Sequence, residues 1–233
     1  MSKSKGNLVE AMPFVERWGS DALRLTILFA GPFGDDIDWK LIAPTLDRRP
    51  AMNAWLGRVN AAVWEAAERD GKQPEELTRL THRTVKGVTE DLERFRFNVA
   101  ISKLQVLTNG IRAVLDAGQG ARDASSVLAQ MLGPLAPFLA EDLWREALGN
   151  QTSVHVSSWP SFDPELARQE RVTLVVQVDG KVRDRLEVDA SADEETCRAL
   201  ALASENARRF LDGREVRQVI VRPPRLVNIV TSG

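Results

Sequence analysis

The chain has 233 residues, a length that fits one or two domains. Hydrophobic residues make up 43% of it and charged residues 27%, which is typical of globular proteins and excludes collagen-like, mucin-like or wholly disordered chains. Its 31 Lys and Arg and 33 Asp and Glu give a net charge of −2. This balance excludes a globally basic nucleic-acid-binding protein, but it leaves room for a local basic surface.

The sequence predicts a cytoplasmic protein with no membrane partner. No apolar run approaches the ~20 residues that cross a bilayer, and the opening MSKSKGN lacks the apolar stretch of a secretory signal. The single cysteine, Cys197, cannot form an internal disulfide, which is compatible with a reducing compartment.

Residues 1–50 predict a loop, a helix and an irregular connection. The opening SKSKGN is polar and contains a glycine. The apolar run SDALRLTILFA begins at Ser20, which suits the N-cap of a helix, and Gly31-Pro32 ends this helix. Residues 33–50 carry two prolines and several aspartates, a composition typical of a connection with little regular structure.

Residues 51–148 predict a bundle of about four helices, because apolar residues recur at helical spacing and the connections are short. Asn98 is placed to cap the helix that follows it, and Gly118 and Gly120 end that helix. The segment PLAPFLAEDLWREALG then forms one more helix, with Pro137 in its first turn. The next segment, SVHVSSWPSFDPE, is expected to be extended.

The C-terminal part changes to a β-rich pattern. The runs VTLVVQV and KVRDRLEV flank Asp179-Gly180, a pair typical of a β-hairpin turn. A helix over residues 192–210 and the strands EVRQVIV and RLVNIVT complete a ββαββ unit. The predicted fold is therefore α+β, mainly an α-helical bundle followed by a small ββαββ domain. The predicted segments are 1–50, 51–168 and 169–233, with a boundary near 165–171.

Basic residues gather in the last segment. Residues 207–233 contain six arginines and two acidic residues, and the forked guanidinium suits phosphate contacts. Lys181, Arg183 and Arg185 alternate along one strand and are expected to share one face of the sheet. The alternative is a basic, solvated edge. The predicted RNA contacts are Lys181, Arg183, Arg185, Arg214, Arg217, Arg222 and Arg225.

The opening loop is a second candidate site. Lys3 and Lys5 alternate with Ser2 and Ser4, and ammonium and hydroxyl groups beside a glycine suit phosphate oxygens. A solvated polar tail is the alternative. Metal binding is not expected, because His82 and His155 are far apart in sequence and lack further ligands at metal-binding spacing. Cys197 is expected to be an ordinary packed thiol.

Several segments resemble leucyl-tRNA synthetases, which are class I aminoacyl-tRNA synthetases. MSKSKGN, WGSDALRLTILFAGP and DDIDW are similar to the second signature loop and the stem-contact segment of that family. RFRFNVAISKLQVLTN and PLAPFLAEDLW resemble helices of the anticodon-binding bundle, and SVHVSSWPSFDPE resembles its exit. VQVDGKVRDRLEV and REVRQVIVRPPRLVNIV are similar to the small C-terminal domain. These segments follow the family's order and cover nearly the whole chain.

The resemblance implies roles for the opening loop. Lys3 would stabilise the pyrophosphate of ATP during adenylation, and Ser2, Ser4 and Lys5 would complete the ATP-binding loop. The first lysine of the signature is missing, because Met1 stands in its second place. The catalytic nucleotide-binding fold would lie upstream, and no Gly-rich phosphate site replaces it. We therefore expect no cofactor on this chain alone, whereas ATP with Mg is implied for the parent enzyme.

The leading hypothesis is thus the tRNA-binding C-terminal portion of a leucine–tRNA ligase-like protein. Its partner would be tRNA, in particular tRNA(Leu), and it would be inactive alone. The catalytic half would either be supplied by a separate catalytic chain or have been lost in truncation. No DNA partner is expected. The alternatives are a free-standing tRNA-binding or regulatory paralogue, and a helical bundle that binds protein partners.

Overall fold

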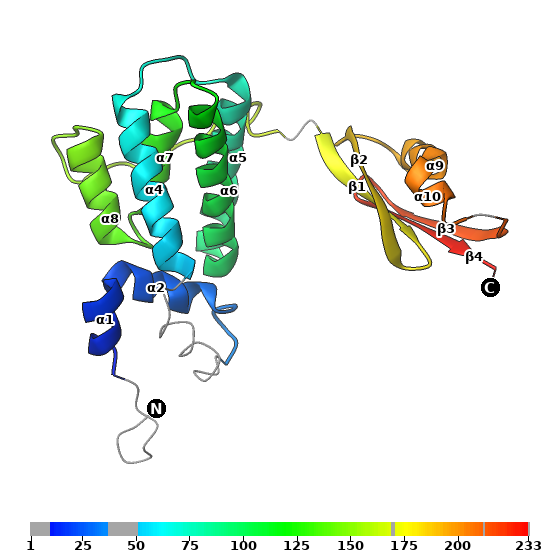
Figure 1. The fold of residues 1–233 in the computed structure, drawn as a ribbon, viewed down its shortest axis with the longest axis horizontal. Helices are drawn as coiled ribbons and strands as arrows, with labels where there is room; N and C mark the ends of the chain where they lie inside the picture. Colours follow the sequence, from blue (N-terminus) through cyan, green and yellow to red (C-terminus); the bar gives the residue numbers. More distant parts are fainter. Residues whose placement is uncertain (1–9, 37–50, 169–170, 212, 233) are drawn as a thin grey trace, which may run out of the picture. The chain divides into compact units, whose positions relative to one another are not determined.

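The structure, a computed structural model, describes residues 10–36, 51–168, 171–211 and 213–232. The chain divides into two units, residues 1–168 and residues 169–233. Figure 1 shows helices throughout the first unit, and a sheet with two short helices on one face in the second. The predicted fold class, a helical bundle followed by a small four-stranded unit, is confirmed. Within the described residues, no helix is both long and apolar enough to cross a membrane.

Two short helices precede the bundle. Helix α2 (Ser20–Phe29) is the helix predicted to begin at Ser20, and α1 (Met12–Trp18) is a further short helix between the opening segment and α2. The buried carboxylate of Asp21 accepts a hydrogen bond from the backbone N–H of Leu139 at 2.9 Å. Burial raises the pKa of Asp21. This contact ties α2 to the last part of the bundle.

The bundle consists of helices joined by short connections, as the periodicity predicts (Figure 1). Pro137 occupies the first turn of α8, also as predicted. A π-helical turn (Leu143–Ala147) continues α8. The helices are α4 (Ala51–Glu68), α5 (Glu75–Glu93), α6 (Phe97–Asp116), α7 (Arg122–Leu132) and α8 (Pro137–Asp142).

Trp55 lies in the middle of the bundle core. Its side chain is fully buried among aliphatic residues of the surrounding helices. Its indole N–H donates to the hydroxyl oxygen of Thr108 on α6 at 3.2 Å, and that hydroxyl donates to the carbonyl of Leu104 at 2.8 Å. A large ring is therefore buried with its one polar atom satisfied.

The turn between α5 and α6 corrects one predicted cap. Helix α6 begins at Phe97, so Asn98 lies inside it and Arg96 holds the N-cap position. The reason is tertiary: the fully buried Asp91 carboxylate forms ion pairs with Arg96 and Lys103, both at 2.6 Å. The backbone N–H of Arg96 also donates to the carbonyl of Asp91 at 2.8 Å, which closes the turn early.

The exit strap, residues 153–168, runs back along the bundle. It contains one 3₁₀ turn (Val154–Val156) and otherwise irregular backbone. Side chains of three bundle helices fasten it. These contacts are Val154 N–H to Glu141 at 2.9 Å, Ser158 C=O to Gln130 at 3.1 Å, Trp159 indole N–H to Thr89 at 2.8 Å, and Asp163 N–H to His82 at 3.0 Å.

The small unit has a mixed sheet with strand order β2-β1-β4-β3. The predicted hairpin turn is confirmed: Asp179 and Gly180 have φ of 51° and 75°, as a two-residue turn between twisted strands requires. The helix expected over residues 192–210 is two helices, because Ser204 ends the first and its hydroxyl caps the second. The elements are β1 (Arg171–Val178), β2 (Lys181–Asp189), α9 (Glu194–Ala203), α10 (Glu205–Arg208), β3 (Val216–Arg222) and β4 (Leu226–Thr231).

The two faces of this sheet differ. The inner face packs against α9 and α10 and is wholly aliphatic at its centre, with Leu174, Val176, Val227 and Ile229 fully buried or nearly so. Cys197 of α9 lies in this core, where burial raises the pKa of its thiol. Within the small unit, no described element covers the opposite side of the sheet, which we call the outer face (Figure 1).

Candidate nucleic-acid interface

The predicted ATP-binding residues lie outside the described part of the chain. Ser2, Lys3, Ser4 and Lys5 all belong to residues 1–9. Their role stays a prediction.

The outer face carries a row of four residues, one from each strand. Arg185 on β2 lies opposite Val175 on β1, Val175 lies beside Leu226 on β4, and Leu226 lies opposite Arg222 on β3. Adjacent strands are about 4.8 Å apart, so the two arginines stand roughly 14 Å apart with aliphatic side chains between them. The next row, Val182, Gln177, Asn228 and Ile220, extends this surface.

The two arginines at the ends of this row are available to an external anion. Both side chains are exposed, and neither has an acidic partner among the described residues. Arg225 adds a third cation at the same end of the sheet. It lies in the β3–β4 turn, where its carbonyl accepts from the N–H of Val175 at 2.9 Å. The row and the turn therefore bring together three of the predicted RNA contacts, Arg185, Arg222 and Arg225.

The prediction that Lys181, Arg183 and Arg185 share one face is wrong. Lys181 pairs with Val178 and Arg185 pairs with Val175, and these β1 residues point to opposite faces. A β-bulge in β2 causes the change, because it leaves Arg183 as an extra residue and shifts the alternation by one. Arg183 instead contacts the ring of Phe210, beyond α10, with its guanidinium carbon 3.7 Å from the ring centroid.

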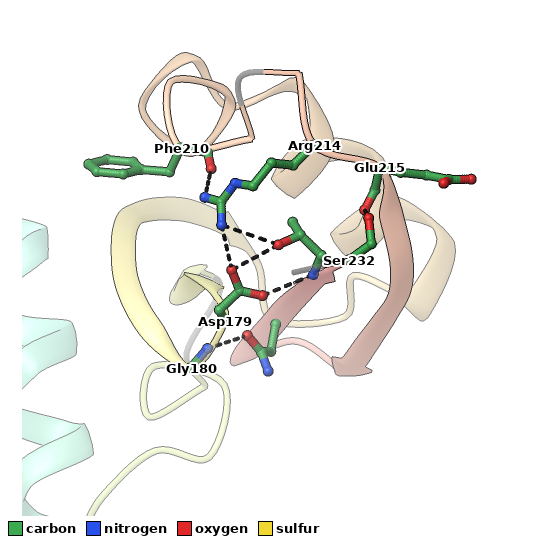
Figure 2. Close-up of polar contacts among 8 residues, drawn as sticks. Asp179, Gly180, Phe210, Arg214, Glu215 and Ser232 are labelled. Atoms are coloured by element: carbon green, nitrogen blue, oxygen red, sulfur yellow. Dashed lines mark hydrogen bonds and ion pairs between the residues drawn. The ribbon is translucent and has the colours of Figure 1, made fainter.

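Arg214 has internal partners (Figure 2). Its guanidinium donates to the Asp179 carboxylate at 3.1 Å, to the hydroxyl of Thr231 at 3.3 Å and to the carbonyl of Phe210. Asp179 also accepts from the N–H of Thr231 at 2.9 Å and from its hydroxyl at 3.0 Å. These contacts join the hairpin turn, the β3 entry and the end of β4. Arg214 therefore has a structural role here, and RNA contact by it stays a prediction.

Arg217 also lies apart from the row. It is exposed at a second register shift, near the start of β3 and at the other end of that strand from Arg222. Two features of this unit were missed by the sequence analysis: the aliphatic pair between the arginines, which needs the strand order, and Phe210. The sequence alone could have singled out Phe210, because it is the only aromatic residue after position 168.

Asp179 provides a test of the network in Figure 2. Hydrogen bonds from Thr231, first its N–H and then its hydroxyl, lower the pKa of Asp179, and Arg214 adds to this. A folded-state pKa below the unfolded value stabilises the fold above about pH 4, and this contribution is lost as the pH falls through the folded pKa. We expect Asp179→Asn to make the small unit less sensitive to acid. Urea unfolding followed by NMR signals of β4, at about pH 6 and about pH 3, measures this, and equal acid sensitivity in both proteins would contradict it.

Known proteins are similar to this chain. The family described as the anticodon-binding domain of tRNA ligase matches residues 75–198. The leucine–tRNA ligases of Acidothermus cellulolyticus and of an Arthrobacter species are both 44% identical to the chain, over 239 and 240 residues. These alignments cover 99% and 100% of the chain but 28% of each relative.

A solved structure is similar as well. The agnB2 LeuRS of Agrobacterium radiobacter K84, in a ternary complex with tRNA and LeuAMS, matches with a TM-score of 0.69 and 26% identity. The match covers 100% of this chain and 31% of that one. The chain therefore belongs to the anticodon-binding domain family of tRNA ligases, and along its whole length it is similar to the C-terminal part of leucine–tRNA ligases.

Proposed function

We propose that this chain is the tRNA-binding C-terminal portion of a leucine–tRNA ligase and that its RNA partner is tRNA(Leu). The observation that carries the proposal is the row on the outer face, in which two unpaired arginines flank an aliphatic pair. Arginines suit phosphates, and the apolar surface between them suits the flat faces of sugars and bases. The similarity to leucine–tRNA ligases along the whole chain supports the same partner.

The proposed reaction joins ATP, leucine and tRNA(Leu) to form leucyl-tRNA, AMP and diphosphate. The chain takes part in it only together with a catalytic portion, and the place of action is the cytoplasm. Ser2, Lys3, Ser4 and Lys5 contribute to ATP binding in that combined enzyme. The chain spans 28% of the length of its leucine–tRNA ligase relatives, which is consistent with this dependence on a catalytic portion. Leucine-dependent pyrophosphate exchange by the purified chain would contradict this.

The RNA-binding proposal is tested by arginine substitutions on the outer face. Arg222→Ala is expected to weaken binding of tRNA(Leu) about tenfold, since one charge-assisted contact to phosphate is lost. The double variant Arg185→Ala/Arg222→Ala should lose more affinity for tRNA(Leu) than the single variant. The magnitude of its slope of log affinity against log salt should fall by about 2. A gel-shift titration at several salt concentrations, with a second tRNA for comparison, measures both quantities.

The matched control is Arg198→Ala. Arg198 lies on α9, outside the outer-face row, and its guanidinium already pairs with Glu194 at 2.6 Å. The Arg198→Ala substitution removes one positive charge from the same unit, and it should leave the affinity for tRNA(Leu) within about twofold of the wild type. Wild-type affinity and salt slope in the double variant would remove the outer face from the RNA-binding site.

A further inference from the structure

Phe210 occupies an unusual place for the largest apolar side chain of its unit. It is the only aromatic residue between positions 169 and 233. The core beneath the sheet is built from aliphatic residues and Cys197, and Phe210 is not part of it. Its side chain is 40% exposed, although burial of a phenylalanine is strongly favourable. A large part of the side chain is therefore exposed at the surface, outside the aliphatic core.

Two separate contacts hold Phe210 in this position. The β-bulge in β2 turns Arg183 out of the strand alternation, and its guanidinium lies over the ring at 3.7 Å. The carbonyl of Phe210 accepts from Arg214, which Asp179 holds in turn. Figure 2 shows the Phe210 side chain extending away from this network. Bulges commonly re-aim a side chain, and here the bulge places a planar cation against a planar ring.

The charges around this pair favour an anionic ligand. Arg183 has no acidic partner among the described residues, and its Nε is buried without a hydrogen-bond acceptor. Arg209, next to Phe210, is exposed. The acid next to Arg183 in sequence, Asp184, accepts from the hydroxyl of Ser204 at 2.5 Å and from the amide of Asn206 at 3.3 Å, and the Ser204 bond is the main cause of its lowered pKa.

We propose that Phe210, backed by Arg183, is a stacking platform for one unpaired base of the RNA that the small unit binds. This rests on the proposed function, and it adds a contact on a different part of the unit from the outer-face row. The guanidinium covers one side of the ring, so the opposite side is the flat surface to which a base adds. Stacking on an aromatic ring accepts any base, and a cation behind the ring strengthens it.

Phe210→Leu tests the platform, because leucine keeps apolar volume but removes the flat ring. Binding of tRNA(Leu) is expected to weaken about tenfold. The slope of log affinity against log salt should stay unchanged, since no phosphate contact is lost. Binding of a fully paired RNA duplex at low ionic strength should also stay unchanged, because a duplex offers no unpaired base. Phe210→Trp keeps a flat ring and should bind tRNA(Leu) like the wild type.

Three results would overturn the platform. They are wild-type affinity of Phe210→Leu for tRNA(Leu), equal loss of tRNA and duplex binding, and failure of Phe210→Trp to retain affinity while its far-UV circular dichroism is native. If Arg185→Ala/Arg222→Ala weakens binding and Phe210→Leu does not, the platform fails and the proposed function stands. If the wild-type chain binds no tRNA, both fail. Capture of a protein through this surface would go with the first of these results, in which Phe210→Leu leaves tRNA affinity unchanged.

Discussion

Replacing Trp55 by alanine is expected to lower the free energy of unfolding of the helical unit by about 3–5 kcal/mol. The ring is fully buried and contacts the central residues of the core, so its removal leaves a large cavity that the surrounding helices fill only in part. Thr108 would keep its hydrogen bond to Leu104, so the loss is mainly one of packing. Urea unfolding of the whole chain, followed by far-UV circular dichroism, measures the change.

Trp64 on the same helix is the matched control. Its side chain is 37% exposed, against 0% for Trp55. Trp64→Ala removes the same number of atoms from α4 but opens no enclosed cavity, and a cost of about 1 kcal/mol is expected. Equal destabilisation by the two substitutions would show that Trp55 is not the centre of the core.

Replacing Gly120 by alanine is expected to destabilise the same unit by about 3 kcal/mol. A Cβ at this position would lie 2.1 Å from the carbonyl oxygen of Gly71 and 2.6 Å from its carbonyl carbon. Both obstacles are backbone atoms, so no side chain can rotate away. The α4–α5 and α6–α7 connections, which meet at this contact, would have to separate. Urea unfolding of the whole chain gives the free energy.

Gly34→Ala is the control for this substitution. No described atom lies within 4 Å of a Cβ built there, and its φ is outside the left-handed region. We expect a change within about 0.5 kcal/mol. If Gly120→Ala proves equally mild, the two connections do not pack as closely as the structure places them.

Local patterns were enough for most elements. Apolar residues at helical spacing predicted the bundle, and the pair Asp179-Gly180 predicted the hairpin, because both signals arise within a few residues and depend on backbone geometry alone. The sequence predicted the N-cap of α6 wrongly. Asn98 has a good capping side chain, but the buried Asp91 holds Arg96 and closes the turn two residues earlier.

In the candidate site, too, local patterns predicted some features and tertiary structure decided others. Its arginines are visible in the sequence as a basic stretch, but their faces are not, because one β-bulge moves every following side chain to the other side of a strand. Arg183 and Arg185 thereby separate, and Arg214 turns inward to Asp179. Gly120 is a further example. The sequence predicts that it ends a helix, but only the tertiary structure shows its close approach to Gly71.

By itself, the sequence determined the fold class, the hairpin, the basic character of the last segment and, through the resemblance of its motifs, the family. These depend on composition and on short-range spacing. Only the tertiary structure decided which arginines stand together, that an aliphatic pair separates Arg185 from Arg222, and that Phe210 stays outside the core. The physical reason is that these features depend on strand order, register and long-range packing, which bring together residues far apart in the chain.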